Sequence, residues 1–496
     1  MNEEQYTTLC NACDRLLLAP DAGPERIATP WLHVIRAHPI FLENYAGIFG
    51  PQPVANSKRH VRSAMSALRH LIKALFNWGE YWSNVGELAP KCDVLLVSHL
   101  VNESFPEYEG DFYYGKVAGE LAERGISSTI ALINHTEATP KALAGRWRQA
   151  KIPRVIFAPV LRFSEEWALY RRARAEASRL QKAAMSQSND LDSRVITRAA
   201  IEAASGGAVA ALRLGEQIKA LVVRLQPRAF VITYEGHSWE RIAFASARAA
   251  WPGIRCIGYQ HAALFNLQHA VQRRLRDKYN PNIILTSGKV AETHLRRNPD
   301  LQDIRIDTLG SNRSFARQSA RTWQISVGGY RTCLVLPEGI VSECNLLFGY
   351  TLECARIMPD MRFIWRLHPN MNYAALTGQN PAFSDLPSNI ILSKHTLAED
   401  IARSYWALYR GSTAIVQAAV TGVHPIYLHQ PGEIPIDTLH DVAELRAQVV
   451  EPEDFKQLVI QADLAGTNSD QIQDYCEQMF TPMNTGTLAA CITGVR

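Results

Sequence analysis

The sequence predicts an α/β protein with two domains, each built on a mainly parallel sheet, preceded by a helical segment. Three observations support this. Short apolar runs typical of buried strands alternate with helical segments, and this alternation occurs twice along the chain. A polar stretch around 311–329 separates the two series, and 496 residues suffice for at least two cores. We therefore expect a helical extension over 1–90, a first domain over 91–315, and a second domain with C-terminal helices over 330–496.

The segment before residue 91 is interrupted by prolines and then becomes a basic amphipathic stretch, Lys58 to Trp82. Such a stretch is usually an ordinary helix with one solvated side, and we favour that interpretation. The alternative is a contact with an anionic membrane surface. The basic residues concerned are Lys58, Arg59, Arg62, Arg69 and Lys73.

The first α/β series begins at the apolar run 93–99. Buried-strand patterns follow, and the intervening segments have helical patterns. The expected strands are 93–99, 128–134, 154–158, 229–234, 254–258 and 282–286, and the expected helices are 114–124, 164–225 with a break near Gly206, and 239–250.

The second series repeats this alternation after the polar stretch. Two parallel sheets covered by helices predict ligand sites at the carboxyl ends of their strands. The expected strands are 332–336, 362–366, 389–392, 405–409 and 424–428, and the expected helices are 342–357 and 412–420.

Composition excludes several classes of function. Lys and Arg total 52 against 48 Asp and Glu, so the net charge of +4 gives no reason to expect nucleic-acid binding. The sequence has no long uncharged apolar run and no secretion signal at its start, so we expect a cytoplasmic protein. Nine scattered cysteines fit free thiols, and the Cys10–Cys13 pair lacks a second pair at zinc-ribbon distance. We expect no metal site.

A His-Pro pair ends one strand of the second series. Arg366 closes the strand, and Pro369 fixes φ and favours an extended conformation for His368. An imidazole held there can donate a hydrogen bond to a phosphate, or it can have a purely structural role.

A glycine turn joins the strand 405–409 to the following helix. Gly411 precedes Ser412 and Thr413, which open that helix. Helix N-termini attract phosphate, and the two hydroxyls add donors. The alternative is that these side chains only cap the helix.

Glu235 follows a strong strand of the first series, beside Gly236. There it can act as a general base towards a sugar hydroxyl or as a nucleophile at an anomeric carbon. The alternative is an acid that interacts with the helix dipole, and we prefer that interpretation for Glu240.

Two further strand ends carry polar side chains. Gln260 and His261 follow the strand 254–258, where they can contact an acceptor, and Glu338 and Gly339 follow the strand 332–336, where they can contact a nucleotide. A structural histidine and a plain turn are the alternatives.

The sequence has a Glu-Gly pair in the first half, followed by His-Pro and Gly-Ser-Thr in the second. In this order these motifs resemble those of bacterial GT-B glycosyltransferases that use CMP-activated sugars. These include sialic-acid and Kdo transferases and related surface-carbohydrate biosynthesis proteins. The resemblance spans roughly residues 92–430. It implies the GT-B fold, with two Rossmann-like domains facing each other across a cleft.

The resemblance also implies roles for residues. His368 matches the His-Pro histidine at the CMP phosphate, and Ser412 and Thr413 match the hydroxyl pair at the phosphate-binding helix. Glu235 matches the catalytic acid, although Tyr234 stands where the family often has a second acid. We assign catalysis to Glu235 and His261. We assign substrate binding to Glu338, Gly339, Arg366, His368, Pro369, Gly411, Ser412 and Thr413.

The expected function is transfer of a 2-keto acid sugar from a CMP donor to a glycan or lipid-linked glycan acceptor in bacterial surface-polysaccharide assembly. No cofactor is expected, since the CMP-sugar is the donor substrate, and peripheral contact with the inner membrane is possible. The alternatives are a UDP- or GDP-sugar transferase, a nucleotide-sugar epimerase of the same fold, or a non-catalytic surface-assembly protein.

Overall fold

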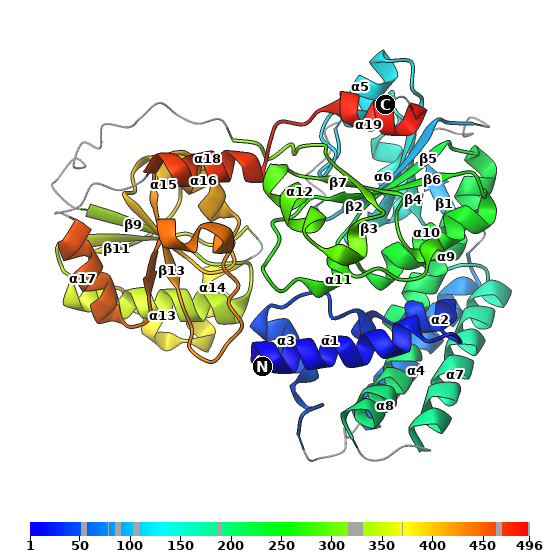
Figure 1. Ribbon diagram of the computed structural model, residues 1–496, viewed down its shortest axis with the longest axis horizontal. Coiled ribbons are helices and arrows are strands. Elements are labelled where there is room, and N and C mark those ends of the chain that lie inside the picture. Colours follow the sequence, from blue (N-terminus) through cyan, green and yellow to red (C-terminus); the bar gives the residue numbers. More distant parts are fainter. Residues whose placement is uncertain are drawn as a thin grey trace.

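The computed structural model describes residues 1–50, 57–77, 79–84, 91–102, 110–185, 190–315, 331–369, 371–462 and 469–494. Two α/β domains lie side by side, and a group of N-terminal helices lies against the first (Figure 1). The fold class predicted from the sequence, two Rossmann-like domains with a helical extension, is confirmed. Most of the predicted linker, residues 316–329, lies outside the described residues.

The first domain is built on an eight-stranded sheet in the order β1-β4-β3-β2-β5-β6-β7-β8. β1 pairs antiparallel with β4, and the other neighbours are parallel. The central strands β2 and β5 are mostly apolar and are buried almost throughout, as expected of parallel strands covered by helices. The strands are β1 Tyr81–Ser83, β2 Val94–Leu100, β3 Ser128–Asn134, β4 Arg154–Phe157, β5 Ala229–Thr233, β6 Arg255–Gln260, β7 Ile283–Thr286 and β8 Arg305–Thr308.

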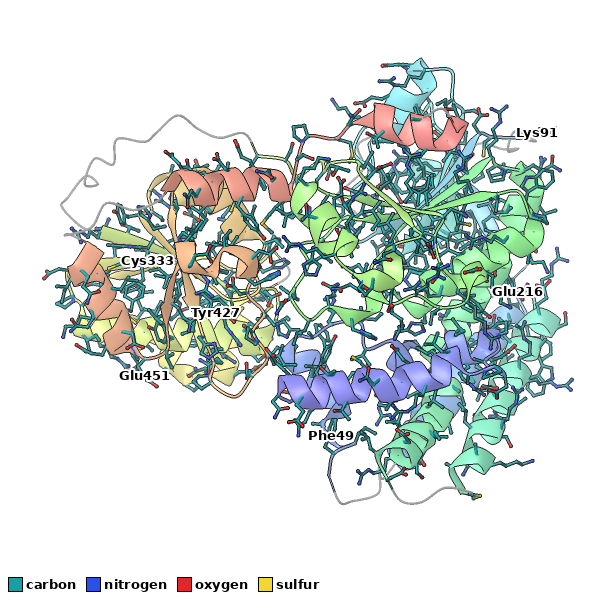
Figure 2. All side chains as sticks on the ribbon, in the orientation of Figure 1. Phe49, Lys91, Glu216, Cys333, Tyr427 and Glu451 are labelled. Atoms are coloured by element: carbon teal, nitrogen blue, oxygen red, sulfur yellow. The ribbon has the colours of Figure 1, made fainter. Side chains whose placement is uncertain are left out.

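The second domain has a six-stranded, fully parallel sheet in the order β11-β10-β9-β12-β13-β14. A hydrophobic cluster covers each face. Cys333 belongs to one cluster and Tyr427 to the other (Figure 2). The strands are β9 Arg331–Leu336, β10 Met361–Trp365, β11 Ile390–Leu392, β12 Trp406–Tyr409, β13 His424–Leu428 and β14 Ala447–Val449.

Each sheet contains one point where the strand order reverses. In the first sheet the chain adds β3 and β4 on one side of β2, then returns to place β5 on the other. In the second sheet β10 and β11 lie on one side of β9, and β12 lies on the other. The carboxyl ends of strands at such switch points form crevices where α/β proteins bind ligands.

The N-terminal helices share a core with a helical insertion in the first domain. One hydrophobic cluster joins Leu9 and Cys13 of α1 to Leu169 of α7 and Val195 of α8. The predicted long helix 164–225 is three helices. α7 ends at Met185, α8 begins at Leu191, and α9 begins after Ser205, next to the predicted break at Gly206. The helices concerned are α1 Glu3–Leu18, α2 Pro24–Ile27, α3 Pro39–Ala46, α4 Ser57–Ala74, α7 Phe163–Met185, α8 Leu191–Ala203 and α9 Gly206–Leu225.

The remaining helices cover the two sheets. In the first domain these are α5 Val117–Glu123, α6 Pro140–Arg146, α10 Ser238–Ala250, α11 His269–Gln272 and α12 Lys289–Arg296. In the second they are α13 Val341–Ile357, α14 Tyr373–Gln379, α15 Leu397–Ala402, α16 Ala414–Val420, α17 Pro452–Ala462 and α18 Ser469–Met479. Short 3-10 helices are Pro30–His33, Asp277–Tyr279, Pro299–Leu301, Pro381–Ser384 and His440–Leu445.

The last helix, α19 (Thr485–Thr493), does not lie with the second domain, as the boundary 330–496 implied. It returns to the first domain and lies beside α5 (Figure 1). Leu488 and Cys491 join the core on that face of the first sheet, and Arg255 donates a hydrogen bond to the Cys491 carbonyl. There α19 buries its apolar face against this side of the first sheet.

Candidate active site

Polar and titratable side chains gather at both switch points. At the first sheet, His99 ends β2, Glu235 follows β5 and His261 follows β6. At the second, Glu338 follows β9, His368 follows β10 and Gly411 follows β12. The structure thus places the predicted site residues in two groups, one per domain.

The turn after β5 is shaped by Glu240. Its carboxylate is buried and accepts hydrogen bonds from three consecutive backbone N–H groups: those of Glu235 (3.0 Å), Gly236 (2.7 Å) and His237 (2.8 Å). Burial, the largest effect, raises the pKa of Glu240 to about 7. Our preferred interpretation of Glu240 as a structural acid at the helix start fits these bonds.

Gly236 is required at the centre of this turn. Its φ is +90°, and a Cβ there would lie 2.2 Å from the backbone oxygen of Ala270. No other residue fits without moving backbone. The neighbour that requires a glycine here is the backbone of the protein's own chain.

The Glu235 carboxylate is mostly buried and paired. His237 Nε2 donates to its Oε2 over 3.2 Å, and an Arg36 guanidinium nitrogen lies 3.9 Å from the same oxygen. Burial alone would raise the pKa of Glu235, but the hydrogen bond from His237 and the field of the neighbouring His261 outweigh it and hold the pKa well below its usual range. Glu235 is therefore ionised at neutral pH.

The pKa of His237 is shifted upwards, opposite to the shift of the Glu235 pKa. Burial would lower its pKa, but the hydrogen bond to Glu235 and the charge of Glu240 together raise it above the ordinary histidine value. Glu235 and His237 therefore form a carboxylate–imidazole pair whose proton resides on the imidazole.

Three further histidines stand close to this pair. His99 Nδ1 lies 2.8 Å from His135 Nε2, and His99 Nε2 lies 3.1 Å from Thr233 Oγ1. Burial lowers the pKa of His99 to about 3 and that of His261 to about 4, so both are neutral. The buried His261 Nδ1 has no hydrogen-bond partner among the described residues, and its ring packs edge-on against Tyr113.

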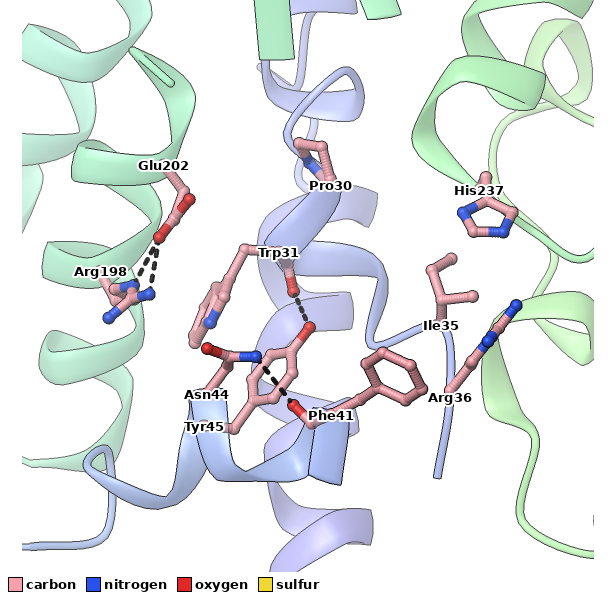
Figure 3. Close-up of a pocket in the computed structure, with 10 residues that line it drawn as sticks. All are labelled: Pro30, Trp31, Ile35, Arg36, Phe41, Asn44, Tyr45, Arg198, Glu202 and His237. Carbon is pink, nitrogen blue, oxygen red and sulfur yellow. Dashed lines mark hydrogen bonds and ion pairs between the residues drawn. The ribbon is translucent and has the colours of Figure 1, made fainter. Parts of the chain in front are cut away.

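A pocket of about 440 Å³ opens beside the Glu235–His237 pair. His237 and Arg36 stand on one side of it, the Arg198–Glu202 ion pair stands on the other, and the aromatic rings of Trp31, Tyr45 and Phe41 lie between them (Figure 3). Trp31 and Tyr45 stack with centroids 4.9 Å apart, and Arg36 lies over the Phe41 ring. The pocket is apolar with a few polar groups, as small-molecule sites usually are.

Glycines allow close packing at the second switch point. A Cβ on Gly339 would lie 2.6 Å from the His368 ring, and one on Gly411 would lie 2.5 Å from the Glu338 carboxylate. These glycines let the loops after β9, β10 and β12 meet in one place. Glu338 also accepts a 2.8 Å hydrogen bond from His38 of the N-terminal helical segment.

A second pocket, of about 270 Å³, lies at this edge of the second sheet. Of the predicted binding residues, Arg366, His368, Pro369, Ser412 and Thr413 line it, and Glu338, Gly339 and Gly411 do not. Thr413 occupies the N-cap position of α16 without a side-chain capping bond, so capping does not account for its hydroxyl. The lining residues are Arg313, Phe315, Leu336, Pro337, Arg366, Leu367, His368, Pro369, Leu397, Ser412, Thr413, Ala414, Gln417 and Phe480.

The cations near this pocket have different roles. Arg366 lines it, but it is paired with the buried Asp400 at 2.7 Å. Arg410 is buried between Glu343 and Glu433, at 2.8 and 2.7 Å.

Arg313 connects the two switch points. It comes from the end of the first domain, lines the second-domain pocket, and lies over the ring of Phe112. Its charge also lowers the pKa of His261, after the larger effect of burial and against the opposing effect of Glu235. The Arg313 guanidinium therefore lines the pocket of the second group and lowers the pKa of a histidine in the first.

Two groups of side chains among the described residues have metal-ligand spacing: the first joins the N-terminal segment to the second domain, and the other joins the two domains. They are His38, Glu338 and Glu343, and His294, His440 and Asp441. In the first, His38 is bonded to Glu338 and Glu343 is paired with Arg410, so protein partners already hold these ligand atoms. Neither group includes Glu235, His261 or His368.

Sequence analysis missed five residues of this site: Arg36, His38, His99, His237 and Arg313. His99 and His237 had a usable signal, because each stands at the carboxyl end of a strand or directly after one. Arg36, His38 and Arg313 had none, since they reach the site from segments far away in the chain.

Comparison with known proteins gives structural matches only. No protein-family model and no curated protein matches the chain. Solved structures similar to it include the glycotransferase of kitacinnamycin (14% identity, 79% of this chain and 95% of that one, TM-score 0.44). Others are a putative UDP-N-acetylglucosamine 2-epimerase from Listeria monocytogenes (13%, 82% and 96%, TM-score 0.45) and MurG from Acinetobacter baumannii (11%, 82% and 100%, TM-score 0.43). At these values the comparisons concern the fold, and our argument about the site rests on the chain's own residues.

Proposed function

We propose that the protein is a glycosyltransferase in bacterial surface-polysaccharide biosynthesis. It transfers a 2-keto acid sugar of the Kdo or sialic-acid type from a CMP donor to a glycan or lipid-linked glycan acceptor. The nucleotide binds in the 270 Å³ pocket of the second domain, and the acceptor binds in the 440 Å³ pocket of the first. The observation that carries this proposal is Arg313, which lines the nucleotide pocket and acts electrostatically on His261, beside Glu235.

The nucleotide pocket offers donors suited to one phosphate. Arg313 supplies a cation, the His368 imidazole a ring N–H, and Ser412 and Thr413 two hydroxyls. Charge-assisted and hydroxyl hydrogen bonds of this kind stabilise a CMP leaving group as negative charge develops on it. In this proposal the protein's own groups meet that charge, and no metal ion is required.

The chemical step is assigned to the Glu235–His237 pair. As the acceptor oxygen attacks the anomeric carbon, its proton passes to the pair, and CMP leaves with the electrons of the broken C–O bond. The proton goes to His237 in its neutral form, whose raised pKa makes it the stronger base of the pair, and Glu235 stabilises the imidazolium that results. We assign to His261, which is neutral and has an unpartnered ring nitrogen, a hydrogen bond to a substrate hydroxyl.

A nucleotide screen tests the donor assignment first. A ligand that binds only the folded state at about 100 times its Kd stabilises that state by about 2.7 kcal/mol. We expect CMP to raise the melting temperature, UDP and GDP to raise it less, and Arg313→Gln to reduce the shift. A larger shift with UDP or GDP would indicate a transferase or epimerase for those sugars instead.

Turnover is measured next by mass spectrometry, with a panel of CMP-sugars and glycan acceptors. Formation of CMP and a glycosylated acceptor supports the proposal. Nucleotide binding without CMP release from any pair of substrates would favour a non-catalytic surface-assembly protein.

A further inference from the structure

Helix α4 carries an exposed apolar stripe that the proposed site does not use. Met65, Leu68 and Ile72 follow helical spacing along one face, and Leu75 and Phe76 continue it in the turn after the helix. Each is half-exposed or more, and Phe76 is 76% exposed. Exposed large apolar side chains elsewhere in the described residues are scattered, so this concentration is a patch rather than ordinary surface.

The opposite face of α4 has a partner. Ala67 and Leu71 pack against the core of the N-terminal helices, and Ala74 is buried. His70 contacts Tyr170 of α7, with its Nδ1 3.4 Å from the hydroxyl oxygen. The helix is therefore held in place by one face while the apolar stripe remains exposed.

The surroundings of the stripe are basic. Arg69 and Lys73 are exposed, four residues apart, and therefore on one face of the helix beside the stripe. Residues 44–79 contain no Asp or Glu at all, while they contain Lys58, Arg59, Arg62, Arg69 and Lys73. An apolar stripe whose own segment carries cations and no acidic residue is complementary to an anionic lipid surface.

We propose that α4 docks the protein on an anionic lipid bilayer, with the stripe 65–76 in the interface and Arg69 and Lys73 on lipid headgroups. A second copy of the chain fits this surface less well, because pairing two such stripes brings like charges together. No single described helix is long and apolar enough to cross a membrane, although α8 and α9, bent by 59°, pass that test as a pair. The proposal concerns binding at the surface, and it does not depend on the proposed enzymatic function.

Vesicle sedimentation with the full chain tests this directly. The two probes are vesicles of phosphatidylcholine alone and vesicles of phosphatidylcholine with an equal amount of phosphatidylglycerol. We expect binding to the anionic vesicles, weak binding to the neutral ones, and a decrease with added salt because salt screens exposed charges. Equal binding to both kinds of vesicle, or to neither, would overturn the proposal.

Two variants separate the apolar and basic contributions. Leu68→Ser/Ile72→Ser/Phe76→Ser should weaken binding about tenfold or more, since it removes the inserted apolar area. The matched control is Leu18→Ser/Val223→Ser/Ile357→Ser, which alters exposed apolar side chains of other helices and should bind as the native protein does.

The charge variant is Arg69→Glu/Lys73→Glu, with an expected loss of about 30-fold. Its control is Arg171→Glu/Arg174→Glu on the exposed surface of α7. Circular dichroism and melting temperature show that each variant is folded. If the native chain is a dimer in solution that the triple serine variant dissociates, and no variant changes vesicle binding, the stripe is an interface between copies and the lipid proposal is wrong.

Discussion

The two switch points are built in the same way and carry different chemistry. In both sheets the chain reverses its strand order beside a central strand, and glycines after the strands let the loops meet. The first gathers a carboxylate and several histidines whose pKa values are shifted in opposite directions. The second gathers hydroxyls, one histidine and a cation around a pocket. Shifted pKa values typify catalytic groups, and convergent donors typify binding sites, so the difference supports our proposal of chemistry in the first domain and nucleotide binding in the second.

The largest effect is expected from Glu235→Gln. If the first switch point carries the chemistry, this change lowers turnover about 100-fold or more, while CMP affinity measured by calorimetry stays nearly unchanged. Because the carboxylate also raises the pKa of His237, NMR titration of that ring should show a lower pKa in the variant. Glu137→Gln, an exposed glutamate of the same domain, is the control. If Glu235→Gln retains near-native turnover, Glu235 does not carry the chemical step.

Glu240→Ala tests whether the first switch point depends on its buried carboxylate for its shape. The change leaves three backbone N–H groups without their acceptor and should cost about 3 kcal/mol of unfolding free energy. Chemical denaturation measures the loss. A cost below about 1 kcal/mol would mean that the turn at Gly236 holds without Glu240.

Glu240→Gln isolates the charge, since an amide oxygen can still accept these bonds. The pKa of Glu240 is about 7 in the folded protein, above its unfolded value. The folded state therefore binds more protons than the unfolded state between about pH 4.5 and 7, and the native protein loses stability as pH rises through that window. The glutamine variant lacks this loss, so its stability relative to the native protein should rise with pH. A constant difference between the two proteins across this range would contradict the assignment.

His368→Ala is expected to have a smaller effect at the second switch point. Burial lowers the pKa of His368, so the hydrogen bond that we propose between this residue and the nucleotide phosphate is made largely by a neutral ring. Losing such a bond should weaken CMP binding about 3- to 10-fold, or roughly 0.7–1.4 kcal/mol. His395→Ala, an exposed histidine of the same domain, is the control. Unchanged calorimetric affinity in folded His368→Ala would contradict a nucleotide role for this residue.

The sequence predicted the strands that lie in the middle of each sheet, because buried parallel strands are continuous apolar runs. It missed β1, β8 and β14, three of the four edge strands, whose side chains are partly exposed and whose apolar signal is weak. The fourth edge strand, β11, was predicted because its three residues are all apolar. It could not predict that α19 returns to the first domain, since nothing local distinguishes the two sheets as partners for an apolar helix.

The candidate site shows the same limit. Glu235, His368 and Ser412 were found because they directly follow strands, and strand ends are where α/β proteins bind ligands. Arg36 and Arg313 reach the site from loops remote in sequence, so only the three-dimensional structure brings them there. Glu240 was correctly interpreted as structural, although the three backbone bonds it accepts depend on a turn that the sequence does not specify.

The smallest expected effect, and the sharpest contrast, comes from Thr413→Ala compared with Thr396→Ala. Both threonines occupy N-cap positions in the second domain, but only the Thr396 side chain accepts a capping bond, from the backbone N–H of Glu399. Thr396→Ala should therefore cost about 1 kcal/mol of stability, or roughly 2–4 °C in melting temperature, and leave CMP affinity unchanged. Thr413→Ala should leave the melting temperature nearly unchanged and weaken CMP binding about two- to threefold, because its hydroxyl faces the nucleotide pocket instead of the helix end. Calorimetry and thermal denaturation of both variants decide the question. If Thr413→Ala lowers the melting temperature as much as Thr396→Ala does and leaves CMP affinity intact, Thr413 is a helix cap and the hydroxyls of this pocket do not bind the phosphate.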